Sequence, residues 1–424
     1  MRKYFLFLST TALLISCATH PIKRVRKNIN KEFSSSFYNH QFTGLFVLDA
    51  SSKDTVLNYN GATYFTPASN TKIATLFTSL SMLPKHIPAF KYLVNGDTLY
   101  IKGTADPSLL HPVFKDSTLL KFIDSYNHIA VIDDHFQDTK YGPGWAWEDF
   151  DTYYSPERSS LPIYGNTVQF FGTDTAATIP SSFSANVTID KGYTRRLEEQ
   201  NTFFIRENST DTTYVPFKIT APLVPQLLSN ASGKDVFSSK VKPVGLWKTM
   251  YSIETDTIAK EMMIVSDNFL AEQLLLASSN TLSDTIYSRI AQEFMFKSHL
   301  KDIAQKPRWV DGSGLSRYNL FTPQSLVHIL QKLRNTYGEK RIFALFPAGG
   351  VSGTLENWYA GKEESPYIFA KSGSLGNNYC LSGYLKTLSG KTLIFSFMNN
   401  HYKHPTTEVK KRMEAILAYL RDTY

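Results

Sequence analysis

The chain has 424 residues, of which 42% are hydrophobic and 19% are charged, and its formal net charge is +8. This composition excludes an intrinsically disordered protein, and the length predicts two or three domains rather than one ordinary core. Because much of the positive charge is concentrated in one short N-terminal segment, the basic character gives no support to nucleic-acid binding.

Residues 1–16 have the features of a secretory signal peptide. Arg2 and Lys3 precede an apolar run that is too short to span a bilayer. The ending Leu-Ile-Ser-Cys17 resembles a bacterial lipobox, which implies that Cys17 becomes the lipidated first residue of a periplasmic protein. An ordinary signal peptide with an incidental cysteine is the alternative. Ala18, rather than aspartate, after Cys17 favours attachment to the outer membrane over the inner one.

Residues 17–40 are interpreted as a basic tether between the lipid and the folded protein. Its basic side chains outnumber its one acidic side chain, Glu32. They are Lys23, Arg24, Arg26, Lys27 and Lys31. A solvated spacer is the expected structure, and contact with an anionic surface is the alternative.

Residues 66–80 predict a helix that begins close to a serine. Thr66 is a good N-cap, Pro67 suits the first helical position, and apolar residues then recur along one face. These apolar residues are Ile73, Leu76, Phe77 and Leu80. We therefore expect Ser69 in the first turn of a buried helix, with Lys72 one turn above it on the same side.

A second Ser-x-x-Lys sequence, Ser239-Lys240-Val241-Lys242, lies directly before Pro243. A helix does not easily begin on a serine in this setting. The pattern alone is weak evidence for a site, so we interpret this second copy as chance.

Residues 86–240 contain alternating apolar and polar runs with many Thr, Asp and Gly residues. The stretches 187–189 and 203–206 are examples of such runs. We predict one or two β-rich accessory domains here, inserted into a main domain formed by residues 41–85 and 241–424.

The sequence Ser266-Asp267-Asn268 lies at a junction between two predicted helices. Apolar residues at helical spacing precede and follow it. They are Leu246, Met250 and Ile253 before the junction, and Leu270, Leu274 and Leu275 after it. An N-cap role for Asp267 or Asn268 is the simple alternative. The position between two other motifs favours a functional site.

Strands are predicted close to both chain ends. Their ranges are 42–48, 56–59, 367–371, 379–386 and 393–398. A final helix follows, with Val409, Met413 and Leu417 on one face. This order suggests one sheet built from both ends of the chain, with the third motif, Lys-Ser-Gly at 371–373, on its first C-terminal strand.

The three motifs bring together the groups that a serine nucleophile needs. A helix N-terminus stabilises negative charge forming on Ser69. Lys72 can act as its base only when its amine is neutral, and both burial and a nearby cation lower a lysine pKa. Lys371 would be that cation. The set S-x-x-K, S-D-N and K-T-G is typical of penicillin-binding proteins and class A β-lactamases, and this chain has serine within the last motif.

The motif set resembles the penicillin-binding D-Ala-D-Ala carboxypeptidases, above all the class C, low-molecular-mass group with a long insert. The segments that carry the likeness are 66–72, 99–107, 145–149, 311–316 and 349–355. They extend over about residues 41–424. The resemblance implies an α+β fold, with a β-lactamase/transpeptidase-like domain whose antiparallel sheet is flanked by helices, and β-rich accessory domains inserted into it.

The resemblance also implies roles for the first two motifs. Ser69 would attack the carbonyl of the penultimate D-Ala, and Lys72 would take its proton. Ser266 would relay a proton toward the leaving amine, coupled to Lys72. Asn268 would hold the Lys72 amine and a substrate amide.

The third motif would bind the substrate and stabilise the oxyanion. Lys371 would attract the terminal carboxylate, and the Ser372 hydroxyl would donate to it. Gly373 would let its strand lie close to the substrate backbone. The backbone N–H groups of Ser69 and Ser374 would form the oxyanion hole.

Three functions remain compatible with these residues. The first is a serine D,D-peptidase that trims D-Ala-D-Ala stems or cuts D-Ala cross-links of peptidoglycan, with β-lactams as covalent inhibitors. The second is a β-lactamase, and the third is a non-catalytic cell-wall binding protein. No cofactor is expected. His401 and His404, three positions apart in a proline-containing loop, do not have the spacing of a helical metal site.

Overall fold

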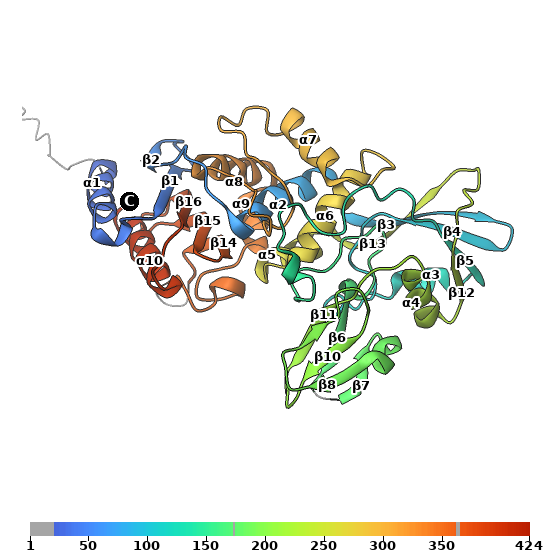
Figure 1. Cartoon of the computed structure of the whole chain (residues 1–424). Coiled ribbons are helices and arrows are strands. Elements are labelled where there is room, and N and C mark those ends of the chain that lie inside the picture. Colours follow the sequence, from blue (N-terminus) through green and yellow to red (C-terminus); the bar gives the residue numbers. More distant parts are fainter. Residues whose placement is uncertain (1–20, 173, 362–364) are drawn as a thin grey trace, which may run out of the picture.

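The computed structural model describes residues 21–172, 174–361 and 365–424. The chain forms an α+β domain from its two ends, and a strand-rich insert extends from that domain (Figure 1). In this view the α+β domain lies on the left, and the insert lies on the right and below. The predicted fold class is confirmed.

A five-stranded antiparallel sheet, in the order β14-β15-β16-β1-β2, joins the two ends of the chain. Its strands are β1 (Phe42–Asp49), β2 (Thr55–Tyr59), β14 (Ile368–Leu375), β15 (Asn378–Lys386) and β16 (Thr392–Asn400). β1 pairs with β16 along its whole length. The sheet therefore places the third motif, on β14, in the same domain as the first motif, which follows β2.

Alternate residues of these strands enter two different hydrophobic cores, as the two-residue period of a strand requires. Phe46 and Tyr384 point into one core, whereas Leu45 and Leu381 point into the other. The first core is covered by α2 (Lys72–Met82), α5 (Thr255–Ile264), α6 (Asn268–Asn280), α7 (Ser288–Ser298), α8 (Pro323–Tyr337) and α9 (Glu339–Leu345). The second is covered by α1 (Pro21–Phe33) and α10 (Thr406–Thr423).

Helix α1 contradicts the prediction that residues 17–40 form a solvated spacer. Val25, Ile29 and Phe33 recur at helical spacing and are 0%, 2% and 4% exposed in the second core. A short 3₁₀ turn, Ser36–Tyr38, buries two further aromatic rings. Counting charges concealed this apolar stripe, because the basic residues and the apolar residues occupy different sides of one helix.

The insert is built around a mixed five-stranded sheet in the order β12-β5-β4-β3-β13. Its strands are β3 (His86–Asn95), β4 (Thr98–Gly103), β5 (His128–Val131), β12 (Asp235–Ser238) and β13 (Lys248–Glu254), with helices α3 (Thr118–Ile123) and α4 (Leu223–Ser232). β5 pairs in parallel with both β4 and β12, and the other pairs are antiparallel.

Two three-stranded sheets are nested inside this insert, between β5 and β12. One contains β6 (Thr167–Phe171), β7 (Asp174–Ile179) and β11 (Thr212–Pro216), and the other contains β8 (Val187–Asp190), β9 (Arg195–Arg196) and β10 (Phe203–Arg206). Buried residues of the nested strands, such as Phe170 and Phe203, share one core with Phe90 and Ile101 of the larger sheet.

The helix predicted around Leu246, Met250 and Ile253 was wrong. Residues 248–254 form β13, which pairs with β3, and Leu246 is 86% exposed, so the helical spacing of these apolar residues was accidental. The sheet of the insert consequently extends to residue 254, beyond the predicted boundary at 240. The α-helix before the second motif, α5, begins only at Thr255.

Candidate active site

Ser69 lies in a 3₁₀ turn, Ala68–Thr71, and the α-helix proper begins at Lys72. The predicted N-cap at Thr66 was wrong, because the Thr66 N–H donates to Asn400 Oδ1 at 2.7 Å and Ala68 has a positive φ of 49°. Asn400 ends strand β16. The turn that carries Ser69 is thus held by the central sheet rather than by its own cap.

The amine of Lys72 is fully buried and has three hydrogen-bond acceptors around it. Lys72 Nζ lies 3.0 Å from Ser69 Oγ, 2.6 Å from Asn268 Oδ1 and 2.8 Å from the Ser313 carbonyl oxygen. A neutral amine has two N–H donors and one lone pair. With its two N–H groups on Asn268 and Ser313, its lone pair faces the Ser69 hydroxyl, which is the arrangement of a general base.

Burial lowers the pKa of Lys72 to about 8, although the carboxylates of Asp267, Asp311 and Glu272 oppose this shift. Burial, together with the positive charge of Lys72, holds the pKa of Lys371 well below its usual range. The charge of Lys72 thus acts on Lys371, whereas the sequence predicted that a charged Lys371 would lower the pKa of Lys72, and burial is what lowers it here.

A loop that follows α7 supplies the third acceptor of Lys72. Ser313 presents its carbonyl oxygen to Lys72, and the Ser313 N–H donates to Glu272 Oε1 at 2.7 Å. Gly314 has a φ of +84°, and a Cβ there would lie 1.9 Å from the Ala68 carbonyl oxygen. Asp311, which is fully buried, accepts the Gly314 N–H at 2.9 Å. This loop is therefore packed tightly against the turn that carries Ser69.

In the second motif, Asp267 caps helix α6 and Asn268 contacts Lys72. Asp267 Oδ1 accepts the Leu270 N–H at 2.8 Å and caps α6, so the simple alternative holds for this residue. Asn268 contacts Lys72 as predicted, but its Nδ2 donates to the Tyr154 carbonyl oxygen at 3.0 Å. Within the described ranges no hydrogen bond joins the half-buried Ser266 to Lys72, so the predicted direct coupling is not formed in this structure.

On β14, the side chains of Lys371 and Ser372 are held by neighbours near the cleft. Lys371 is fully buried, and its Nζ donates to the Ser372 carbonyl oxygen at 2.8 Å. Ser372 Oγ donates to Thr354 Oγ1 at 2.7 Å. Ser372 therefore already has a polar partner next to the position where a substrate carboxylate was predicted.

Gly373 is close to the nucleophile turn. A Cβ at this position would lie 2.6 Å from the Pro67 carbonyl oxygen and 3.0 Å from the Asn70 nitrogen. Asn70 Nδ2 also donates to the Lys371 carbonyl oxygen at 2.9 Å. In this structure the glycine makes room for the turn of Ser69, whereas the sequence reasoning had assigned that space to the substrate.

The site opens into a cleft of about 760 Å³. Predicted residues that line it are Ser69, Ser266, Asn268, Ser372 and Ser374. Residues of the insert between 146 and 154 also line the cleft, as do Arg317 and Thr354. Lys72, Lys371 and Gly373 lie beneath the surface of the cleft. The structure thus brings together the three motifs, which are far apart in the sequence.

Two further expectations concerned a lipidated cysteine and the absence of a metal site. Cys17 falls outside the described residues, and among the helices that the structure describes none is long and apolar enough to cross a membrane. In the described part of the chain no three His, Cys, Asp or Glu side chains are grouped so that they could hold a metal ion.

Sequence reasoning missed a buried ionic network behind the site. Glu272 on α6 is 1% exposed and binds Arg158 of the insert at 3.2 Å, and Arg158 also binds Asp138 at 2.9 Å. Burial raises the pKa of Glu272 to about 7. One indication of this network was present in the sequence, because Glu272 lies one helical turn after Asn268 on the predicted helix. That spacing alone does not predict that its partner is Arg158.

The sequence matches the D-Ala-D-Ala carboxypeptidase 3 (S13) family over residues 25–191 and 242–422, which is most of the chain. The chain belongs to this family. It is 23% identical over 438 aligned residues to D-alanyl-D-alanine carboxypeptidase DacB of Haemophilus influenzae, covering 90% of each chain. The family and the enzyme class predicted from the motifs are confirmed.

Solved structures show that the fold is shared. Penicillin-binding protein 4 of H. influenzae superposes with a TM-score of 0.71 at 18% identity, covering 89% of this chain and 95% of that one. A predatory peptidoglycan endopeptidase from Bdellovibrio bacteriovorus gives a TM-score of 0.54 at 13% identity, covering 90% and 92%. The long insert is thus part of the shared architecture.

Proposed function

We propose that this protein is a penicillin-sensitive serine D,D-peptidase that hydrolyses D-Ala-D-Ala stems, D-Ala cross-links of peptidoglycan, or both, through an acyl-enzyme. The observation that carries the proposal is the fully buried Lys72 amine, 3.0 Å from Ser69 Oγ, with two further fixed acceptors. A lysine in this setting can take a proton from the serine hydroxyl near neutral pH.

In the proposed acylation step, Ser69 Oγ attacks the carbonyl carbon of the penultimate D-Ala while Lys72 takes the hydroxyl proton. The tetrahedral intermediate places its oxyanion between the backbone N–H groups of Ser69 and Ser374. The C–N bond then breaks, and the proton that Lys72 took from Ser69 passes through the Ser266 hydroxyl to the leaving amine, a step for which Ser266 and Lys72 come into contact in the substrate complex. Water later hydrolyses the ester on Ser69.

The lysine of β14 couples substrate binding to this chemistry. A substrate carboxylate next to Lys371 raises its pKa, because an opposite charge favours the ammonium form. The positive charge that this creates lowers the pKa of Lys72 further and favours its neutral form. Binding of the terminal carboxylate therefore favours the neutral Lys72 amine, which deprotonates the Ser69 hydroxyl.

The names of the relatives support the substrate class. A structure of penicillin-binding protein 4 from H. influenzae is described in complex with a β-lactam, and a B. bacteriovorus endopeptidase is described as acylated by penicillin G. By analogy, β-lactams would acylate Ser69 in this protein. Both carboxypeptidases and endopeptidases occur among these relatives, so both substrates belong to the proposal.

We also propose that the protein is a periplasmic lipoprotein, held by a lipid on Cys17 and, given Ala18, at the outer membrane. The support is the basic start, the short apolar run and the Leu-Ile-Ser-Cys ending of residues 1–17. Radiolabelled palmitate incorporated in cells by the parent chain, and not by Cys17→Ser, would support this anchor. Equal incorporation by both would exclude it.

Product analysis provides the test of the activity. We expect purified protein to release D-Ala from a pentapeptide stem, to cleave a dimeric cross-linked muropeptide, or both, and preincubation with penicillin should prevent this. Sustained turnover of nitrocefin without peptide hydrolysis would instead establish a β-lactamase. Penicillin binding without either activity would establish a binding protein.

A further inference from the structure

Helix α1 carries four exposed basic side chains on the side that faces away from the protein. At about 100° of rotation per residue, they lie within an arc of roughly 100°, centred about 170° from the buried Val25, Ile29 and Phe33. The four are Lys23, Arg24, Lys27 and Lys31. We call them the α1 basic face.

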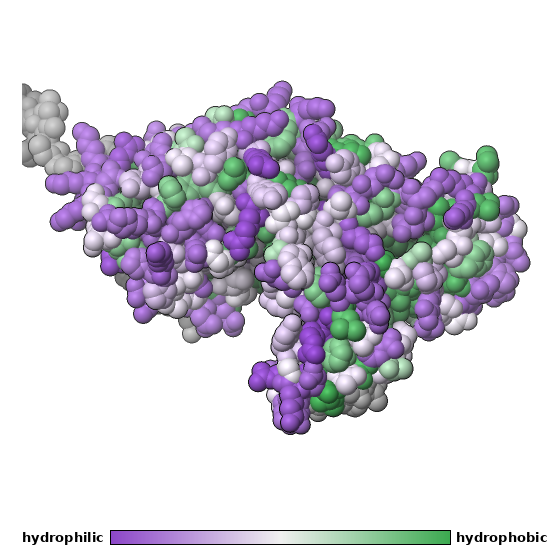
Figure 2. Space-filling view, viewed as in Figure 1, coloured by the Kyte–Doolittle hydropathy of each residue, from purple (hydrophilic) through white to green (hydrophobic). Residues whose placement is uncertain are grey.

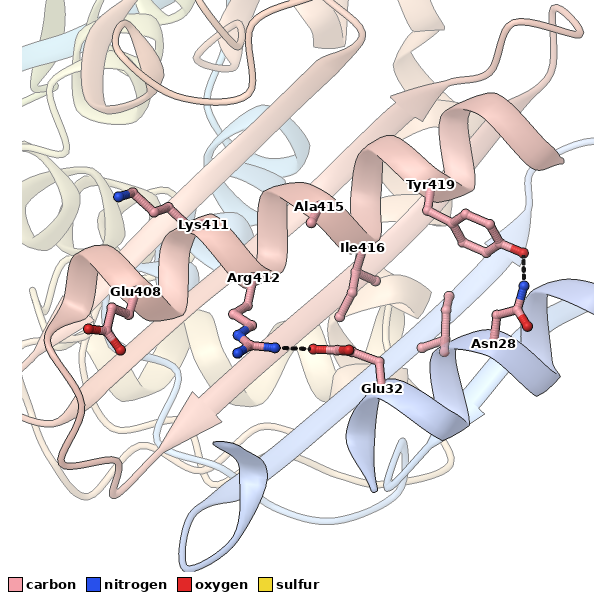
Figure 3. Close-up of a pocket in the computed structure, with 9 residues that line it drawn as sticks. Asn28, Glu32, Glu408, Lys411, Arg412, Ala415, Ile416 and Tyr419 are labelled. Carbon is pink, nitrogen blue, oxygen red and sulfur yellow. Dashed lines mark hydrogen bonds and ion pairs between the residues drawn. The ribbon is translucent and has the colours of Figure 1, made fainter. Parts of the chain in front are cut away.

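The α1 basic face is fixed to the catalytic domain rather than carried by a flexible arm. Arg412 Nη1 of α10 donates to Glu32 Oε1 at 2.7 Å, and Asn28 Nδ2 donates to the Tyr419 hydroxyl at 2.7 Å (Figure 3). These two contacts span a groove of about 560 Å³ between α1 and α10. The direction of the basic face is therefore set by the fold.

Neighbouring acidic groups leave this positive charge largely unneutralised. Glu32 is the one acidic residue of α1, and it pairs with Arg412 on the α10 side. Arg26 donates its Nε to the Val56 carbonyl oxygen at 3.0 Å, so its charge is directed toward the sheet. Glu408 of α10 lies across the groove. The surface at this end of the molecule is hydrophilic (Figure 2).

The position of α1 in the chain indicates what lies opposite its basic face. Pro21, where α1 begins, is four residues after Cys17. Four residues of fully extended chain span at most about 15 Å. If Cys17 carries the proposed lipid, the basic face lies close to the head groups, where anionic lipids attract lysine and arginine.

We propose that the α1 basic face docks on anionic phospholipid head groups and orients the enzyme on its membrane. This inference rests on the proposed lipid anchor at Cys17. The strands β3, β4, β5 and β12 of the insert lie at the opposite end of the molecule from α1 (Figure 1), so they project away from the bilayer. The cleft is then held in one fixed orientation relative to the bilayer.

Vesicle sedimentation tests the basic face without the lipid. Residues 17–424 carrying Cys17→Ser should sediment at low salt with vesicles of phosphatidylcholine and phosphatidylglycerol, but not with phosphatidylcholine alone. Replacing Lys23, Arg24, Lys27 and Lys31 together by Gln should weaken this binding at least about tenfold. A matched variant, with Lys240, Lys248, Lys260 and Lys301 replaced by Gln, loses four exposed charges elsewhere and should bind like the parent.

The outcomes separate this inference from the proposed anchor and activity. The docking proposal is overturned if the four-Gln α1 variant sediments with anionic vesicles as well as the parent does. It is also overturned if the α1 variant and the matched variant lose binding equally, or if the parent does not bind anionic vesicles. Penicillin labelling of each variant shows that it is folded. Palmitate incorporation reports on Cys17 alone, so a failed anchor and a failed basic face give different results.

Discussion

The two Ser-x-x-Lys sequences of this chain have the same spacing and very different surroundings. In the first, Lys72 is fully buried, and its Nζ contacts Ser69 Oγ, Asn268 and Ser313. In the second, the Lys242 side chain is 59% exposed and pairs with Asp134.

The serine of the second sequence is equally far from a catalytic setting. Ser239 Oγ accepts the N–H of Val241 at 3.0 Å, two residues along the same loop. Among the described residues, the partner of Lys242 is Asp134, and this ion pair leaves the lysine side chain mostly exposed to solvent. The comparison shows that the four-residue pattern supplies the groups, whereas burial and acceptors from distant segments supply the chemistry. Variants of matching residues can sharpen or break this comparison.

The largest difference is expected between the two serines. Ser69→Ala removes the proposed nucleophile and should abolish covalent labelling by fluorescent penicillin, measured on denaturing gels. Ser239→Ala should be labelled like the parent. Labelling that persists in Ser69→Ala would exclude Ser69 as the nucleophile.

The two lysines should differ almost as strongly. Lys72→Met keeps a similar volume but removes the proposed base, so the acylation rate should fall by about 10²–10⁴-fold in stopped-flow measurements. Lys242→Met should retain the parent rate. Comparable rates for Lys72→Met and the parent would show that another group deprotonates the serine.

Gly314 tests whether the packing around the first motif matters. Gly314→Ala places a methyl group 1.9 Å from the Ala68 carbonyl oxygen, so displacement of the Ser69 turn should slow acylation about 10²-fold. Gly390 has the same φ of +84° but nothing within 4 Å of its Cβ position. Gly390→Ala is therefore a control for backbone strain, and an equal loss in both variants would refute the packing argument.

The smallest expected effect is a shift in pH dependence. Because Lys72 must be neutral to act as a base and its pKa is about 8, the acylation rate should rise with pH through about 8. Glu272 favours the ammonium form, so Glu272→Gln should lower the pKa of Lys72 and move this rise about 0.5 units toward lower pH.

The control for this shift is Glu293→Gln, which removes an exposed carboxylate on α7 and should leave the profile unchanged. In the Glu272 variant, Asp267 and Asp311 still raise the pKa of Lys72. The expected movement of the pH profile is therefore small. A profile that stays in place, or moves to higher pH, would contradict the electrostatic role of Glu272.

Local patterns in the sequence predicted several elements well. The strands around Leu45 and Leu381 could be predicted because they are short apolar runs whose successive residues enter two cores. The last helix could be predicted from the apolar residues on one of its faces. Residues 21–33 were predicted to be a spacer because the charge count hid the apolar side of helix α1. Residues 248–254 were predicted to be a helix because their apolar residues happen to have helical spacing, although they pair as strand β13.

The sequence by itself determined the order of the three motifs, the family to which they belong and the strands at both chain ends, because these depend on residue types and short-range periods. Only the tertiary structure decided which Ser-x-x-Lys pair is desolvated, that Ser313 faces Lys72, and that α1 presents a basic surface. The reason is physical: burial and hydrogen-bond geometry arise from segments hundreds of residues apart, and no local pattern records which of them meet.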